Sequence, residues 1–291
     1  MIEAKKPFII IVSGPNGAGK TTFYNSIISQ NVYLSDAVFL NCDNEIAELK
    51  KLPEFSKKYQ DIISAQQAYI YDLKPATHVV KPGPFIYSVG RFHSFAEQFS
   101  RLNVRISRIA TQNMRQKIKN AFAGMKHIVF ETTSTAGRMK KLAQQHGYEI
   151  YGCHICVFEP ELSVARVQQR VKKGGHDIPE QIIYQRYAEN IRTLSNVMRT
   201  ETSAIVIDNS GKVPFTPVFG LSEDCIIDIT DCPEYLQSTY NCLVGIYQQK
   251  SLKEIMNLED DIDVKMLSAG QRKTFIQIML LNMLGKVTCQ K

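Results

Sequence analysis

The most constraining feature of this chain is a run of apolar residues that leads without a break into a glycine-rich loop. Residues 8–12 read Phe-Ile-Ile-Ile-Val, and four of these five side chains are β-branched, which favours a strand buried on both faces of a parallel sheet. Residues 14–21 then fit the pattern G-x-x-x-x-G-K-[ST] in full. A strand, a loop and a helix in this order predict an α/β fold with a phosphate-binding loop.

The residue types of this loop suit the binding of a nucleoside triphosphate. Glycines at positions 14, 17 and 19 allow successive backbone N–H groups to point at phosphate oxygens, and the following helix presents its positive end to the same anion. Lys20 supplies a positive charge for the β- and γ-phosphates, and Thr21 supplies a hydroxyl for Mg²⁺. ATP and Mg²⁺ are therefore the predicted cofactors. The predicted ATP-binding residues are Gly14, Pro15, Asn16, Gly17, Ala18, Gly19, Lys20, Thr21 and Thr22.

The length and composition are those of an ordinary globular protein. The chain has 291 residues, of which 44% are apolar and 22% charged, and no apolar run approaches the roughly eighteen residues that span a bilayer. The first seven residues lack the apolar region of a signal peptide, and the seven cysteines are scattered and odd in number. We therefore expect a cytoplasmic protein without a disulfide framework or a membrane partner, with delivery into another cell left open.

Charge and cysteine spacing each allow a second interpretation. The net charge of +7 is compatible with nucleic acid, but the basic residues form no long run and do not alternate with aromatic residues, so an anionic small substrate explains them as well. Cys153 and Cys156 have the spacing of a metal or redox pair. They lie in a predicted strand, where residues three apart point to opposite faces, so core packing is favoured over zinc.

Alternating strands and helices predict a three-layer phosphate-loop fold with a central parallel sheet of about five strands. The five predicted strands are residues 8–12, 37–40, 127–131, 149–158 and 203–207. We assign residues 1–212 to this domain. Residues 53–103 form a helical insertion, which we place over the edge of the site where selectivity would arise. Residues 213–291 form a C-terminal extension of unassigned role, with a further strand at 224–229 and two helices.

Two carboxylates follow predicted strands, where the ligand-binding edge of a parallel sheet lies. Asp43 comes after the second strand, and it is either a proton acceptor or the N-cap of the next helix. Glu131 ends the third strand, near the position where phosphate-loop enzymes place an acid linked to Mg²⁺, so we favour a metal role. The hydroxyl-rich residues 132–135 that follow either cap the next helix or hold a substrate hydroxyl.

Basic residues gather on two predicted helices joined by a glycine turn. Arg166 and Arg170 fall on one face of the first helix because they are four residues apart. Arg186 and Arg192 lie on the second helix, residues 180–198, after the segment at 172–179. These two helices are a candidate lid, whose arginines would neutralise charge on a phosphoryl group during transfer.

Taken together, these segments resemble the zeta toxin family of phosphate-loop kinases, in its subgroup with a Gly-Gly-His lid. The matching segments occur in the family's order across residues 7–210, apart from the insertion. They are Gly14–Thr22, Asn41–Asp43 with Ile46-Ala47, Phe130–Thr133, Arg166 to Arg170, Gly174-Gly175-His176 with Pro179-Glu180, Arg186-Tyr187 and Asp208–Ser210.

The resemblance implies a kinase that transfers the γ-phosphate of ATP to a hydroxyl of a UDP-amino sugar such as UDP-N-acetylglucosamine. It implies that Lys20 and Thr21 hold ATP and Mg²⁺, with Glu131 as a second metal-linked residue. Asp43 occupies the family's general-base position and would accept the proton of the sugar hydroxyl. An antitoxin protein is a further partner that the resemblance implies.

The same resemblance assigns the remaining site residues. Glu131 and Thr133 match a Glu-x-Thr element that contacts substrate, while Arg170 and Arg186 resemble lid arginines that hold the triphosphate. The family's element continues to an arginine two residues after the threonine, and this chain has Thr135 there. Either the substrate differs, or Arg138 or a residue of the insertion replaces that contact.

Two other functions stay open from the sequence. The first is an ATP-binding switch that uses residues 213–291 to engage a partner, and the second is an RNA-end or nucleoside kinase, suggested by the positive charge. Residues 267–272 also echo the signature of ABC-type ATPases. No apolar strand ending in acids follows them, so we interpret Ser268 as the cap of the last helix.

Overall fold

The computed structural model describes residues 6–72, 84–173, 178–212, 214–222, 225–256 and 262–283, and the Gly-Gly-His segment at 174–176 lies outside these ranges. The chain divides into two compact units, one formed by residues 1–39 and 121–291 and the other by residues 40–120. None of the helices in the described ranges combines the length and apolar character that a bilayer span requires.

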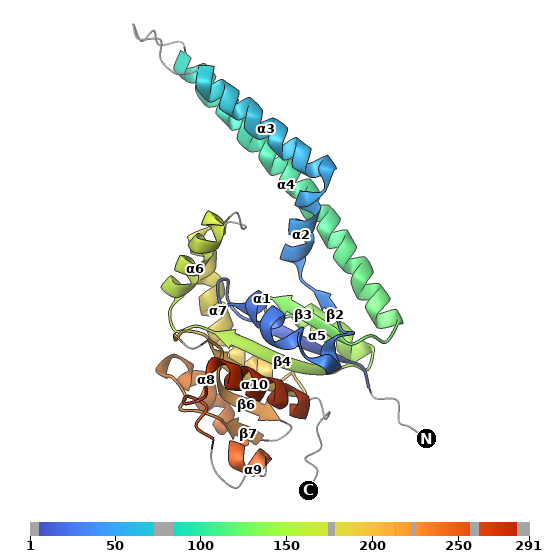
Figure 1. The fold of residues 1–291 in the computed structure, drawn as a ribbon, viewed down its shortest axis with the longest axis vertical. Helices are drawn as coiled ribbons and strands as arrows, with labels where there is room; N and C mark the ends of the chain where they lie inside the picture. The colour runs from blue at the N-terminus through green and yellow to red at the C-terminus, as the bar shows by residue number, and fades with distance from the viewer. Residues whose placement is uncertain are drawn as a thin grey trace. The chain divides into compact units, whose positions relative to one another are not determined.

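An eight-stranded sheet forms the centre of the larger unit (Figure 1), with strand order β2-β3-β1-β4-β5-β6-β7-β8. The pairs β3–β1, β1–β4 and β4–β5 are parallel, β6 is antiparallel to β5 and β7, and β8 is parallel to β7. The strands are β1 Phe8–Ser13, β2 Val38–Leu40, β3 Ile128–Thr132, β4 Glu149–Cys156, β5 Ser203–Asp208, β6 Thr216–Ser222, β7 Cys225–Asp228 and β8 Gln248–Ser251.

The mostly parallel sheet confirms the predicted α/β class, but the predicted count of five strands was wrong. The five predicted strands correspond to β1–β5, and the extension after residue 212 adds β6, β7 and β8 to the same sheet. Two of the additional strands carry weak sequence signals. Pro217 and Gly220 interrupt the apolar pattern of β6, and β8 reads Gln-Gln-Lys-Ser.

Helices cover both faces of the sheet and complete the predicted three layers. Alternate residues of β1 pack in one apolar cluster with side chains of α1, the following π-helical turn and α10, whereas α7 and α8 pack on the other face of β5. The helical segments of this unit are α1 Lys20–Phe23, the π-helix Tyr24–Ile28, the 3₁₀ helix Val32–Leu34, α5 Gly137–Gln145, α6 Pro160–Lys172, α7 Glu180–Met198, α8 Glu234–Val244, α9 Leu252–Met256 and α10 Ala269–Met283.

The C-terminal extension is built into this core. Ser268 and Gln271 form a reciprocal cap at the start of α10: the Gln271 Oε1 accepts from the Ser268 backbone N–H at 3.0 Å, and the Ser268 hydroxyl accepts from the Gln271 backbone N–H at 3.4 Å. Gln277 then donates to the carbonyl of Ile27 at 3.0 Å. The capping interpretation of Ser268 is confirmed. Helix α10 is also hydrogen-bonded to the π-helix Tyr24–Ile28, which follows α1.

The smaller unit is helical and contains the predicted insertion. It holds α2 Cys42–Lys51, α3 Pro53–Asp72 and most of α4 Pro84–Ala123. α3 and α4 lie side by side (Figure 1), and their contact surfaces form an apolar cluster of their own. The buried members of this cluster are Leu49, Phe55, Leu102, Ile106 and Ala110.

Candidate active site

The loop between β1 and α1 has the backbone that its glycines predict. Gly14 has φ 149° and Gly19 has φ 97°, values that side-chain-bearing residues rarely adopt. A Cβ atom at Gly14 would lie 2.2 Å from the carbonyl oxygen of Ile155, and one at Gly19 would lie 2.6 Å from Nδ2 of Asn209. Both positions therefore require glycine, for space as well as for conformation.

Lys20 folds back over its own loop. Its side chain is buried, and Nζ donates to the carbonyl oxygens of Gly14 at 3.0 Å and Pro15 at 2.9 Å. These contacts hold a positive charge at the centre of the loop, because the ammonium group lies against the same backbone whose N–H groups line it. Such a charge suits the phosphates of a bound nucleotide.

Thr21, in the first turn of α1, lies next to Glu131 of β3. The Thr21 hydroxyl donates to Oε1 of Glu131 at 2.9 Å and to Oε2 at 3.0 Å. Glu131 lies on β3 directly beside Val12 of β1, so the sheet itself places the carboxylate next to the start of α1. A hydroxyl and a carboxylate oxygen are ligands that Mg²⁺ accepts, together with water and substrate phosphates. In the described ranges, no three His, Cys, Asp or Glu side chains gather into a metal site.

Asn209 and Arg166 both donate hydrogen bonds to backbone carbonyls of the phosphate loop, a role that the sequence did not reveal. The Asn209 side chain donates to the carbonyl of Ala18 at 2.7 Å and accepts from the backbone N–H of Phe215 at 3.3 Å. Arg166 donates to the Asn209 carbonyl at 2.8 Å and to the Gly17 carbonyl at 3.4 Å. Burial lowers the pKa of Arg166, and the neighbouring Asp208 opposes that shift. The available signals were the match of Asp208–Ser210 and of Arg166 to Arg170 to family segments, and neither match indicated this contact with the phosphate loop.

One face of α7 contacts two parts of the site. Arg186 donates to Oδ1 of Asn16 in the phosphate loop at 3.0 Å. Asn190, one turn later, donates to the carbonyl of Thr133 at 3.0 Å, directly after β3. The predicted lid helix therefore touches both the phosphate loop and the predicted substrate element, and Asn190 is a second residue that sequence reasoning missed.

The hydroxyl-rich turn after β3 does not cap the next helix. The N-cap of α5 is Ala136, which has no side-chain hydrogen bond of this kind, so the capping interpretation was wrong. Within the turn, the Thr132 hydroxyl accepts from the Ser134 backbone N–H at 3.1 Å. A small cavity of about 10 Å³ lies beside the turn. Its lining residues include Ser13, Thr133, Ser134, Thr135, His154, Glu189, Asn190 and Thr193.

Asp43 lies in the smaller unit, on the first turn of α2. The cap of this helix is Asn41, whose Oδ1 accepts from the backbone N–H groups of Asp43 at 2.8 Å and Asn44 at 3.2 Å. The capping interpretation of Asp43 was therefore wrong. Its side chain is exposed, and its role as proton acceptor stays a prediction.

Arg170 is exposed on α6, four residues after Arg166, and its contact with a triphosphate stays a prediction. Cys153 and Cys156 are buried thiols that pack in two different apolar clusters, which agrees with core packing. Burial raises the pKa of both thiols well above the usual value.

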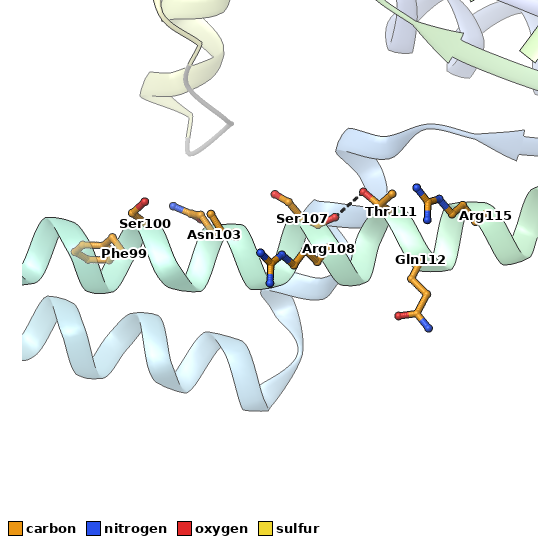
Figure 2. A pocket seen from close by; sticks show the side chains of 9 residues that line it. Phe99, Ser100, Asn103, Ser107, Arg108, Thr111, Gln112 and Arg115 are labelled. Carbon is orange, nitrogen blue, oxygen red and sulfur yellow. Dashed lines mark hydrogen bonds between the residues drawn. The ribbon is translucent and has the colours of Figure 1, made fainter. Parts of the chain in front are cut away.

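A broad hollow of about 1130 Å³ lies along the exposed side of α4 in the smaller unit. Figure 2 shows hydroxyl and amide side chains spaced three or four residues apart along this helix, with arginines among them. The residues that define it are Phe99, Ser100, Asn103, Val104, Ser107, Arg108, Thr111, Gln112 and Arg115. This lining is basic and contains no acid, which suits a molecule that carries hydroxyl and phosphate groups.

The fold and the loop define a phosphate-loop α/β protein. A family model described as an AAA domain matches residues 9–189, and the chain belongs to this family. A curated relative, described as an uncharacterized protein of Haemophilus influenzae, is 35% identical over 71 residues, which is 23% of this chain and 51% of the relative. The chain thus spans about half the length of that relative.

Solved structures resemble this chain at low sequence identity. One comes from the PezAT chromosomal toxin–antitoxin system of Streptococcus pneumoniae, with 13% identity, a TM-score of 0.43 and coverage of 86% of this chain and 87% of that chain. Another is the native complex of AvrRxo1-ORF1 with ORF2, with 11% identity, a TM-score of 0.50 and coverage of 83% and 76%. At these identities the likeness concerns the fold alone.

Proposed function

We propose that this protein is an ATP-dependent kinase that transfers the γ-phosphate of ATP to a hydroxyl group of a small molecule. The observation that carries this proposal is the contact of Thr21 with both oxygens of Glu131, beside a loop that holds Lys20 at its centre. Phosphoryl transfer needs a positioned triphosphate, a metal ion and charge neutralisation more than covalent chemistry. The site offers groups for each of these needs.

Each site residue has a defined part in this proposal. The backbone of the phosphate loop and Lys20 would bind the β- and γ-phosphates, while Thr21 and Glu131 would hold Mg²⁺. Arg186, already bonded to the loop through Asn16, and Arg170 would neutralise charge as the phosphoryl group moves.

For the acceptor we propose a UDP-amino sugar similar to UDP-N-acetylglucosamine, on the strength of the resemblance to the zeta toxin family. Asp43 would accept the proton of the reacting hydroxyl, and Thr133 would contact the sugar. Threonine at position 135, where the family has arginine, indicates that one phosphate or sugar contact is made differently. The same resemblance suggests an antitoxin partner.

The C-terminal extension no longer supports the alternative function, an ATP-binding switch with a separate partner-binding tail. β6, β7, β8 and α10 of the extension complete the sheet and pack on the π-helix that follows α1, so most of residues 213–283 is needed for the core. The kinase is therefore the better supported function, and an RNA or nucleoside acceptor remains as the variant to test against the sugar.

Phosphorus NMR of Mg-ATP with a panel of UDP-sugars tests the proposal, with Lys20→Ala as the inactive control. A new phosphomonoester signal with the wild type alone would support both the kinase and the sugar acceptor. ADP without a phosphorylated sugar would overturn the sugar assignment, and the same panel with RNA ends and nucleosides would then be measured. An absence of ADP with every acceptor would overturn the kinase itself.

A further inference from the structure

Four buried polar side chains form a continuous chain of contacts behind the phosphate loop. Ser13 is the last residue of β1, and its hydroxyl lies 2.7 Å from Nδ1 of His154, its direct partner on β4. Nε2 of His154 lies 2.8 Å from Oε2 of Glu201, and Oε1 of Glu201 lies 2.6 Å from Nζ of Lys140. We call these four residues the Ser13–Lys140 network.

The side chains of this network are buried, and a glycine beside them leaves the room that they occupy. His154 and Glu201 have fully buried side chains, and that of Lys140 is 6% exposed. Gly152 lies two residues before His154 on the same face of β4, and a Cβ atom there would lie 2.1 Å from Oε2 of Glu201. A side chain at this position would therefore displace the carboxylate from the histidine.

Stability alone is a poor reason for such an arrangement. Burying an ion pair costs desolvation energy, and apolar residues of similar volume usually stabilise a core as well or better. The contacts of the network instead join β1, β4, α5 and the turn that follows α7. Lys140 extends the chain further, because its Nζ also donates to the Val197 carbonyl at 2.8 Å and the Thr200 hydroxyl at 3.0 Å, at the end of α7.

Helix α7 is thus connected to the phosphate loop at two places. Near its beginning Arg186 bonds directly to Asn16 of the loop. Just beyond its end Glu201 reaches the strand that feeds the loop, through His154 and Ser13. Two attachments fix the rotation of a helix as well as its distance, which a single contact cannot do.

We propose that Ser13 and His154 are positioning residues, which hold the end of β1 in register with α7 and α5 so that the phosphate loop is preorganised for ATP. Nδ1 of His154 faces the Ser13 hydroxyl and Nε2 faces Glu201, so both ring nitrogens have a hydrogen-bond partner. Removing the Ser13 hydroxyl takes away the side-chain link between the end of β1 and Glu201, while the backbone pairing of Ser13 with β3 and β4 and the ion pair of Glu201 with Lys140 stay intact. The inference rests on the proposed function only in taking ATP as the ligand.

Two substitutions at position 154 separate positioning from simple stability. The amide of His154→Asn lies close to where Nδ1 is now, and so keeps the contact with Ser13, whereas the amide of His154→Gln reaches toward Nε2 and keeps the contact with Glu201. We expect His154→Asn to bind ATP within about twofold of the wild type, and His154→Gln to bind it roughly fivefold to tenfold more weakly. The melting temperatures should fall in the opposite order, since Glu201 stays paired in His154→Gln.

Ser13→Ala provides a second test that leaves His154 and Glu201 in place. We expect its dissociation constant for ATP, measured by calorimetry, to rise about fivefold. Ser203→Ala is the matched control, because Ser203 is also buried and makes one strand hydrogen bond, 2.7 Å to the Leu221 carbonyl, at the other end of the sheet. ATP binding by this control should equal that of the wild type.

The outcomes distinguish the inference from the proposed function. If the wild type binds ATP, Lys20→Ala does not, and Ser13→Ala binds as the wild type does, the positioning role is overturned and the kinase stands. If ATP affinity in the position 154 variants follows their melting temperatures, the network is structural only and the inference is likewise overturned. If the wild type itself binds no ATP, both proposals fail.

Discussion

The hydroxyl of Thr21 donates to both carboxylate oxygens of Glu131, at 2.9 and 3.0 Å. The two residues are far apart in the sequence, and they meet because β3 and β1 pair in parallel with Glu131 beside Val12. In the proposed kinase the same two groups would hold the metal ion. The parallel register of the sheet would then set the position of both ligands.

Glu131→Gln should weaken the binding of Mg²⁺ and leave the fold intact, because glutamine keeps an oxygen for the Thr21 hydroxyl but removes the negative charge. We expect the Mg²⁺ concentration for half-maximal ATP turnover to rise by roughly ten- to a hundredfold. Turnover measured across a magnesium titration tests this. Glu149→Gln is the control, because Glu149 begins β4 whereas Glu131 lies near the end of β3, and this control should behave as the wild type. An unchanged titration for Glu131→Gln would remove Glu131 from the metal site.

Asn190→Ala should impair use of the acceptor more than use of ATP. The Asn190 amide donates to the carbonyl of Thr133 and so fixes the turn that is proposed to contact the acceptor. Loss of one such hydrogen bond, about 1 kcal/mol, corresponds to roughly a fivefold rise in KM for the acceptor. Steady-state kinetics with each substrate varied in turn tests this, with Asn196→Ala, at an exposed position of the same helix, as the control. Equal changes in both KM values would argue against the assignment.

The sequence predicted what depends on local patterns. The apolar run of β1, the glycines of the loop, Lys20 and Glu131 all carry signals within a few residues of themselves. The contact of Asn209 with the carbonyl of Ala18 joins residues 191 positions apart, and no local sequence pattern near either residue predicts this contact. Asn190 was missed for the same reason, since its partner belongs to a turn on another element.

The N-cap of α2 and the edge strand β8 could not be predicted from the sequence for a different reason. Asn41, Asp43 and Asn44 all have side chains suited to an N-cap, so composition cannot choose among them, and the backbone of Asn41 decides by staying extended. β8 has no apolar alternation to detect, because its residues are polar and largely exposed. It pairs with β7 because the preceding helix α8 returns the chain to that edge.

Asp43→Asn should abolish most phosphoryl transfer and preserve ATP binding. Asparagine cannot accept the proton of the acceptor hydroxyl, and loss of a general base lowers turnover by about 10²- to 10⁴-fold. Single-turnover transfer from labelled ATP tests the first expectation, and calorimetry with ATP tests the second. Glu48→Gln on the exposed side of α2 is a matched control from the same helix. Wild-type turnover by Asp43→Asn would rule out the base assignment.

Tyr187 should make the stability of the protein fall in alkaline solution. Its hydroxyl donates to the carbonyl of Phe158 at 2.6 Å, and burial raises the pKa of Tyr187 to about 12. Because the folded pKa exceeds the unfolded value of about 10, this group stabilises the fold fully below pH 10, and the contribution is lost between pH 10 and 12. Urea unfolding at pH 9, 10 and 11 should therefore show a shallower decline for Tyr187→Phe than for the wild type. Tyr33→Phe, at an exposed site, should keep the wild-type slope, and an equal slope for Tyr187→Phe would mean that this hydroxyl does not set the alkaline response.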